Sequence, residues 1–486
     1  MTPILILLIS LPFAAALACL VLPVRASQAL TVVVGVGCFG LCVALIPTVG
    51  HRDVSALKYL RADALSVVFL LATAFLYAVT AMYTIGYLRS EEDAADFPRY
   101  SRRLYVGPNL FAWSMLCAPL VNGLALLWVA VEVTTVVSAL LVVIDDTDRA
   151  AEAAWKYVLI ASAGLGLALL GTIFMYYAGA QVIGQSYDLA FAPLLQAAPH
   201  LPHTAVRLAF ILAVLGFGTK VGFFPVHTWL PDAHSEAPTP VSAMLSGSLL
   251  AVSFYAVLRF YQIAVATVGP RFPQTVLLVF GVASLCLAAL YLLDQADVKR
   301  MLAYSSIEHM GILAIGVSFG VPVASVGVLL HVLAHAAAKG NAFMGAGVFV
   351  QKFRTKELGG MRSGLSVLPW SAPAFLLAVL ALTAMPPFGI FRSEFYIVAG
   401  GLSGGHNASA VILVVLVTLA FLGLAWNATR MVYAPGPVTT ERGEPSAWMV
   451  VPPVIGLVAL LVLGVHPPAH LLDLLNRGAA ELAGRL

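Results

Sequence analysis

Long apolar runs separated by short polar connections recur along this chain. A membrane-spanning helix needs about 20 mostly apolar residues, and this rule predicts about 14 spans. We expect them at residues 3–24, 27–47, 62–86, 104–121, 123–144, 154–178, 204–229, 239–263, 274–293, 301–319, 322–350, 370–399, 409–432 and 448–465. The longest polar connections are too short for a hydrophobic core of their own. The pattern therefore predicts an all-α polytopic membrane protein.

The predicted spans form a single membrane domain, residues 1–486, with four parts. We expect N-terminal helices at 1–103, a first set of five at 104–263, a second set of five at 274–432, and a last helix with a short surface helix at 448–486. The seventh and twelfth spans are both interrupted by Gly and Pro and both carry an ionisable residue, Lys220 and Glu394. This pattern is typical of transporters built from two repeats.

Composition supports the membrane interpretation and argues against several functions. The chain is 61% hydrophobic and 10% charged, whereas soluble proteins carry about 25% charged residues. A net charge of +3, spread over short connections, argues against nucleic-acid binding. The five cysteines form no CxxC pair and predict no iron–sulfur or zinc framework. A GxGxxG sequence at 35–40 lies inside the second span, where small residues indicate close helix packing rather than a nucleotide loop.

Basic residues are distributed unevenly between alternate connections, which sets the orientation. One set of connections holds fifteen: Arg25, Arg89, Arg99, Arg102, Arg103, Arg149, Lys156, Lys299, Arg300, Lys352, Arg354, Lys356, Arg362, Arg430 and Arg442. The other set holds seven: Arg52, Lys58, Arg61, Arg259, Arg271, Arg477 and Arg485. The richer set is expected in the cytoplasm, which leaves both termini outside, as an even number of spans requires.

The stretch from Gly216 to Ala237 places Lys220 inside an apolar span that glycines and Pro225 interrupt. A lysine at the bilayer centre costs about 2.5–3.5 kcal/mol on insertion scales. A broken helix at that depth is tolerated only where protein or a water-filled cavity covers the freed backbone. The alternative is a lysine whose stem reaches the interface, but the long apolar run on either side favours a charge-handling site. A polar bend, the connection between the seventh and eighth helices, is expected to hold His227, Asp232, His234 and Glu236.

Further ionisable residues fall inside the predicted spans: Glu132, Glu308, His309, His331, His335, Lys339 and Glu394. His331, His335 and Lys339 follow one another at intervals of four, so they share one helix face. Each residue alone has a structural explanation: Glu132 could simply pair with Lys220, and a lone histidine is usually a hydrogen-bonded core residue. His331 and His335 could bind a metal, but no carboxylate or cysteine lies nearby in sequence, so no metal site is expected. The whole set indicates a proton relay.

A relay needs groups whose proton affinity can change. Burial favours the neutral forms of lysine and glutamate, and an opposite charge nearby favours the ionised forms. A buried Glu–Lys pair therefore keeps its lysine protonated only while the ionised carboxylate stays close. Histidine can bridge such groups because its ordinary pKa is near neutrality.

Three stretches carry a resemblance to a known family. They are KVGFFPVHTWLPDAHSEAPTPVSAMLSG from residue 220, KRMLAYSSIEHMG from residue 299 and HVLAHAAAKGNAF from residue 331. Together they resemble the antiporter-like, proton-translocating subunits of respiratory complex I and of related membrane-bound hydrogenases. The sequence Ser305–Gly311 looks most like the F-type subunit of the hydrogenase-4 and formate hydrogenlyase group.

The resemblance implies a core of 14 helices with two inverted five-helix repeats and broken helices 7 and 12. It implies that Glu132 and Lys220 form the family's Glu–Lys pair, that Lys339 is the central lysine with His331 and His335 beside it, and that Glu394 lies on the exit side. Some relatives carry a further lysine on helix 8, where this chain has Ala251. Either Lys339 alone is then the centre, or Glu308 and His309 supply the link.

These observations lead to one hypothesis and two alternatives. The hypothesis is a proton-translocating, multi-pass subunit in a prokaryotic plasma membrane. This subunit would hold no redox cofactor. It would work with other membrane subunits and with peripheral iron–sulfur redox subunits of a hydrogenase- or NADH:quinone-type oxidoreductase. The first alternative is a subunit of a multisubunit Na⁺/H⁺ antiporter without a redox partner. The second is a scaffold, or the membrane partner of an inorganic-carbon uptake system, because fold alone does not determine function.

Overall fold

The computed structural model describes residues 1–90, 92, 96–436 and 440–484. Arg485, one of the basic residues predicted on the outer side, lies outside the described residues. Helices dominate. The first half contains α1 (Thr2–Cys19), α2 (Val24–Val49), α3 (Ala64–Arg89), α4 (Phe97–Leu120), α5 (Leu124–Val142), α6 (Asp148–Ile183), α7 (Phe191–Ala197), η1 (Ala198–His200), α8 (His203–Val221), α9 (Leu230–Glu236), α10 (Thr239–Met244), the π-helical segment η2 (Leu245–Leu249) and α11 (Leu250–Val268).

The second half continues the same architecture. It contains α12 (Arg271–Leu292), α13 (Val298–Ser318), α14 (Pro322–Phe353), η3 (Leu358–Gly360), α15 (Gly364–Val367), α16 (Ser371–Leu382), α17 (Gly389–Ser403), α18 (Asn407–Tyr433), η4 (Ala447–Met449), α19 (Val451–Val465) and α20 (Ala469–Leu482). Two three-residue strands, β1 (Val54–Ala56) and β2 (Leu60–Ala62), form a small antiparallel hairpin that the apolar pattern did not predict.

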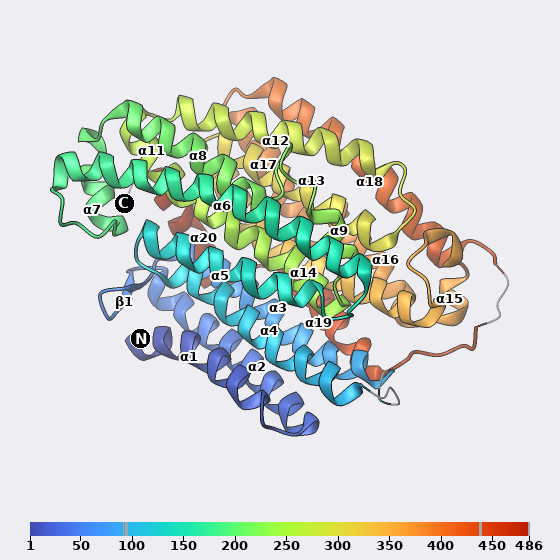
Figure 1. The fold of residues 1–486 in the computed structure, drawn as a ribbon. Helices are drawn as coiled ribbons and strands as arrows, with labels where there is room; N and C mark the ends of the chain where they lie inside the picture. The colour runs from blue at the N-terminus through green and yellow to red at the C-terminus, as the bar shows by residue number, and fades with distance from the viewer. Residues whose placement is uncertain (91, 93–95, 437–439, 485–486) are drawn as a thin grey trace.

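The long helices run side by side in one bundle, and the two chain ends lie at the same end of it (Figure 1). The hairpin, α7 and α20 lie at that end as well, whereas α15 lies at the opposite end. An even number of crossings brings the termini to one side. With the predicted orientation, the end that holds the termini is the outer end.

Eleven helices of the described chain are long and apolar enough to cross a membrane. They account for all the predicted spans except the fourth, tenth and twelfth. Helix α4 begins with three arginines, and α13 carries charged residues near its start and in its middle, so neither is apolar enough. The twelfth span is divided into α16 and α17, each too short alone. The all-α membrane fold is confirmed, while the count of fourteen stays a prediction.

Two expectations from the sequence were wrong. The stretch after Pro225 is not a bend throughout, because residues 230–236 form the short helix α9. Arg259 does not lie in a connection, because it falls inside α11 with only 2% of its surface exposed. Without Arg259 the imbalance of basic residues between the two sides becomes larger, so the predicted orientation is unchanged.

Close packing of small residues brings the broken helix α8 against α6. A Cβ atom on Gly216 would lie 2.4 Å from the amide nitrogen of Ala168, and one on Gly164 would lie 2.4 Å from Oγ1 of Thr219. Small residues allow helix backbones in membranes to approach closely. This contact fixes the part of α8 that carries Lys220.

Candidate functional site: buried charges along the bundle

The break in α8 places Lys220 at the end of a helix, deep in the protein. The helix ends at Val221, and the next residue, Gly222, has a left-handed φ of 88°. The indole nitrogen of Trp229 donates a hydrogen bond of 2.8 Å to the carbonyl oxygen of Thr219 and so bridges the break. Freed backbone groups at this depth must find protein partners. The second broken helix repeats the arrangement, because residues 383–388 separate α16 from α17, which carries Glu394.

Lys220 is fully buried and is held by helix α5. Its Nζ atom donates to the carbonyl oxygen of Val131 at 3.1 Å, to Oγ1 of Thr135 at 2.8 Å and to Oγ1 of Thr134. The ring of Tyr157 lies 6.0 Å from the ammonium, within the range of a cation–π interaction. All these partners are neutral.

Glu132 lies next to these partners on α5 but does not form an ion pair with Lys220 in the described chain. Its Oε2 atom is buried and has no hydrogen-bond partner. Val131, whose carbonyl oxygen accepts from Lys220, directly precedes Glu132 in the chain. The expected Glu–Lys pair is therefore present as two neighbours, with the ammonium bound to hydroxyl and carbonyl oxygens instead of the carboxylate.

Lys339 has a similar environment in the second half of the chain. Helix α14 carries it, and its Nζ atom donates to the carbonyl oxygen of Leu302 at 3.0 Å and to Oγ of Ser305, both on α13. Glu308 lies one turn further along α13 and is 3% exposed. Each lysine is thus bound by a carbonyl and by at least one hydroxyl of a neighbouring helix that also carries a glutamate, half-buried Glu132 on α5 and buried Glu308 on α13.

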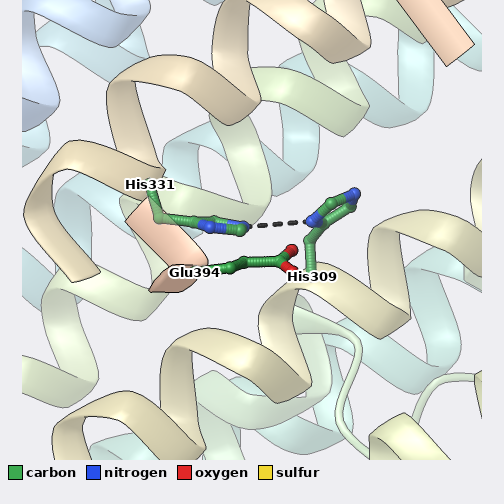
Figure 2. Close-up of side chains that lie close together, drawn as sticks. All are labelled: His309, His331 and Glu394. Atoms are coloured by element: carbon green, nitrogen blue, oxygen red, sulfur yellow. Dashed lines mark hydrogen bonds between the residues drawn. The ribbon is translucent and has the colours of Figure 1, made fainter. Parts of the chain in front are cut away.

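Three histidines continue from Lys339 toward Glu394. Nδ1 of His309 and Nε2 of His331 share a hydrogen bond of 3.0 Å, and Nδ1 of His331 and Oγ of Ser393 share another of 2.9 Å. The rings of His309 and His335 have centroids 5.1 Å apart. Figure 2 shows His309 and His331 facing each other, with the carboxylate of Glu394 beside them. Helices α13, α14 and α17 therefore bring these groups into one cluster.

This cluster contains unused hydrogen-bonding capacity. The atoms without a partner in the described chain are Nε2 of His309, both ring nitrogens of His335 and Oε1 of Glu394. Such buried, unpaired atoms carry a large desolvation penalty. They are the positions at which water molecules or a moving proton can be accepted.

The same cluster contains the group of residues that could hold a metal ion. Ligand atoms of His309, His331 and Glu394 lie within 4.8 Å of one another. Sequence spacing did not reveal this group, because its three members come from three helices. The hydrogen bond between the two imidazoles uses the nitrogens that face each other, so a metal would have to displace it. The expected absence of a metal site stays a prediction.

The π-helical segment η2 of the first half contacts the helix that binds Lys339. Oγ of Ser246 in η2 lies 2.7 Å from Oγ of Ser306 on α13, next to the Ser305 that binds Lys339. A π-helical turn often marks a functional site. Ala251, at the position where some relatives carry a lysine, is 1% exposed and follows directly in α11.

The residues predicted after the break lie toward the end of the bundle opposite the termini, which is the predicted cytoplasmic end, on or next to α9. Asp232 pairs with Lys156 at 3.3 Å and with Arg300 at 2.9 Å, and Glu236 pairs with Lys356 at 3.0 Å. His227 and His234 are both buried, and Nδ1 of His234 lies 2.8 Å from the carbonyl oxygen of Leu230.

Asp232 and Glu236 also line an open cavity of about 340 Å³. They are separate from the lysine and histidine clusters, although all were predicted as one set of charges.

Sequence reasoning missed a third charged cluster at the outer end. Arg259 donates to both carboxylate oxygens of Asp63, at 2.6 and 2.7 Å. Glu481 of α20 accepts hydrogen bonds from the backbone amides of Ala64 and Leu65 at 3.1 and 2.9 Å. Asp63 also caps α3 through the amide of Ser66. An aspartate directly before an apolar run is a recognisable capping signal, but its arginine partner lies 196 residues away.

The sequence of this chain matches a known family of membrane subunits. The sequence profile of the NADH:quinone oxidoreductase/Mrp antiporter transmembrane family matches residues 121–422, which is more than half of the chain. The chain belongs to this family. The hydrogenase-4 component F homolog of Methylacidiphilum infernorum is 36% identical over 369 residues, which cover 74% of this chain and 76% of the relative. The resemblance inferred from the sequence is confirmed.

Solved structures agree with the fold. A chain of the Mrp complex from Dietzia sp. DQ12-45-1b superposes with a TM-score of 0.86 at 20% identity, covering 99% of this chain and 98% of that one. A chain of respiratory complex I from Thermus thermophilus with bound NADH superposes with a TM-score of 0.81 at 24% identity, covering 98% and 99%. The protein is thus a multi-pass membrane protein with the fold of these subunits.

Proposed function

We propose that this chain is the proton-translocating membrane subunit of a complex I-like oxidoreductase of the hydrogenase-4 or formate hydrogenlyase type. The proposal rests on the two buried lysines. Each is fully buried, is bound by neutral oxygens of a neighbouring helix, and has a carboxylate close by on that same helix, half-buried in Glu132 and buried in Glu308. A purely structural lysine would be expected in a direct ion pair.

The geometry supports a stepwise path. Glu132 and Lys220 form the first station, Ser246 and Ser306 join the two halves, Lys339 and Glu308 form the second station, and the histidines lead to Glu394. When a carboxylate approaches an ammonium it favours the protonated lysine, and when it moves away the proton can be released. Charge rearrangement can therefore pass along the bundle without a redox group in this chain.

The relatives support the choice of partner class. The similar chain from M. infernorum is named as a hydrogenase-4 component, and the family description includes NADH:quinone oxidoreductases. We infer that this chain works in a prokaryotic plasma membrane with further membrane subunits and with peripheral iron–sulfur subunits that carry out the redox chemistry. We assign no redox cofactor and no metal to this chain.

The test compares electron transfer with proton movement in the intact complex, purified and reconstituted in vesicles. We expect Lys220→Met and Glu132→Ala each to abolish coupled proton uptake, because each removes one member of the first station. Assembly and electron transfer to an artificial acceptor are expected to persist. The control is Lys58→Met, which removes an exposed lysine paired with Asp188 at the outer end. Unimpaired proton uptake in both test variants would rule the proposal out.

The composition of the purified complex separates the proposal from its alternative. Iron–sulfur and hydrogenase-type subunits are expected to copurify in mild detergent. If only small hydrophobic partners copurified, and vesicles exchanged Na⁺ for protons without an electron donor, the chain would be an antiporter subunit instead.

A further inference from the structure

A large open cleft lies at the cytoplasmic end of the first helices, away from the buried lysines. Its volume is about 660 Å³, and it lies between the end of α1, the first half of α4 and the last turns of α5. Three arginines, Arg99, Arg102 and Arg103, line it near the start of α4. Its remaining walls are mostly aliphatic.

The lining changes from charged to apolar along α4. Arg99, Arg103, Val106 and Leu110 follow at intervals of three or four residues, so they lie on one face of the helix. At 1.5 Å per residue, this face extends about 16 Å from the first arginine to Leu110. Half of the hydrocarbon core is about 15 Å thick. The face therefore passes from the headgroup level well into the hydrocarbon.

Helix α5 supplies the opposite apolar wall. Val137, Leu140 and Leu141 line the cleft, and Leu140 has 65% of its surface exposed. Gly107 of α4 lies directly against Leu141, because a Cβ atom there would be 2.4 Å from its Cδ2. The two helices meet at this point and leave an apolar groove that is open to the bilayer.

The charges at the mouth of the cleft are positive and largely unused. Within the described part of the chain, Arg99 and Arg102 have no hydrogen bond or ion pair, and Arg103 only reaches the carbonyl oxygen of Ile144 at 3.5 Å. Asp146 is the one acidic residue of the described chain that lines the cleft. Three arginines and one aspartate line the cleft itself, and Arg99 and Arg103 also border a neighbouring cavity that Asp96 and Asp145 line. The lining of the cleft is therefore net positive above an apolar groove.

We propose that this cleft binds an anionic phospholipid of the cytoplasmic leaflet, with its phosphate on the three arginines and an acyl chain in the groove between α4 and α5. Arginine presents a planar fork of donors that suits a phosphate group. Basic pockets between helices at the cytoplasmic surface are a recognised way to bind anionic headgroups. A free phosphate would use the arginines but not the apolar groove, and an acidic peptide would not extend into hydrocarbon.

The test measures retained lipid by native mass spectrometry on the purified complex, with cardiolipin, phosphatidylglycerol or phosphatidylcholine added. We expect the anionic lipids to remain bound and phosphatidylcholine to be lost. Arg99→Gln with Arg102→Gln is expected to reduce bound anionic lipid by about tenfold or more. The matched control is Arg430→Gln with Arg442→Gln, which removes two exposed cytoplasmic arginines outside the cleft.

A second variant probes the groove while keeping the arginines. Val106→Trp is expected to fill the groove and to weaken retention of the same lipids, while inorganic phosphate at millimolar concentration does not displace them. The proposal is overturned if phosphatidylcholine binds equally, if both arginine pairs have equal effects, or if phosphate displaces the lipid. It is also overturned if crosslinking places a protein segment in the cleft of the intact complex.

Discussion

At the scale of single residues, the ligands of each buried lysine matter as much as the lysine itself. Thr135 accepts a hydrogen bond of 2.8 Å from Lys220, and Ser305 has the same role for Lys339. Hydroxyl groups can accept from an ammonium and can turn to donate once the lysine is neutral. These hydroxyl groups can therefore form a hydrogen bond with the lysine in both of its protonation states, which a carboxylate that only accepts hydrogen bonds would not do.

Thr135→Val tests this role without changing the shape of the side chain. A hydrogen bond to a charged group contributes about 1.5–3 kcal/mol, so coupled proton transport is expected to fall by about tenfold or more. The control is Thr172→Val, which removes a buried hydroxyl that bonds only the carbonyl oxygen of Ala168 in its own helix. Equal rates for the two variants, measured as proton uptake per electron, would contradict the role.

Arg259→Leu tests the buried pair with Asp63 at the outer end. The substitution leaves buried Asp63 with only the longer charged contact of 3.5 Å to Arg61, and breaking a buried ion pair from one side typically costs about 3–5 kcal/mol. We expect a clear decrease in the thermal unfolding temperature of the detergent-purified protein. Arg271→Leu, which removes an exposed arginine at the same end, is the control and should leave unfolding nearly unchanged.

At the scale of elements, interruptions in the helices place the chemistry. Helix α8 ends beside Lys220, α17 begins five residues before Glu394, and η2 is π-helical where the two halves meet. Regular helices would satisfy their own backbone and leave little for side chains or water to bind. The broken segments instead create positions at which neighbouring helices exchange hydrogen bonds.

The serines of η2 allow a matched comparison within one segment. Ser246 contacts Ser306 on α13, whereas Ser248 donates to Thr73 on α3 at 2.7 Å. If the link to α13 takes the place of the helix-8 lysine, Ser246→Ala should lower coupled proton transport by about three- to tenfold, as expected for one lost hydrogen bond. Ser248→Ala should have little effect. A larger loss in Ser248→Ala would show that the contact with α3 carries the coupling.

At the scale of the whole molecule, the C-terminal helix α20 joins the outer end of the bundle to the start of α3. Burial, together with the nearby charge of Asp63, raises the pKa of Glu481 to about 8, although Arg259 and the two amides act in the opposite direction. For Asp63 burial alone would raise the pKa, but the charges of Arg259 and Arg61 outweigh it and hold the pKa well below its usual range. The pKa values of the two carboxyl groups are therefore shifted in opposite directions, which favours the ionised form of Asp63 and the protonated form of Glu481.

This difference predicts a pH dependence of stability. Because the pKa of Glu481 is raised in the folded protein, its contribution is complete below its ordinary value of 4.5 and is lost as the pH rises through about 8. The unfolding temperature should therefore decrease by roughly a few °C between pH 6 and pH 9. Glu481→Gln, which keeps the hydrogen-bonding shape but cannot ionise, should reduce this decrease. An unchanged slope in the variant would assign the pH dependence to other groups.

Several features of the molecule were determined by the sequence alone. The apolar runs predict the helices closely, for example residues 123–144 against α5 and 409–432 against α18. Each lipid-exposed segment must satisfy its own backbone, so local composition decides where a spanning helix begins and ends. The ionisable residues inside those runs were visible for the same reason, because each is an exception to the local pattern.

Only the tertiary structure decided which of these residues meet. Lys220 binds Val131 and two threonines rather than Glu132, and Glu394 comes from α17 to lie beside His309 and His331. Such contacts depend on how each helix is rotated and on how closely small residues let neighbouring helices approach. The hydropathy of a sequence indicates neither the rotation of a helix nor its distance from its neighbours. The charges were therefore predictable one by one, whereas their partners depend on how the helices pack.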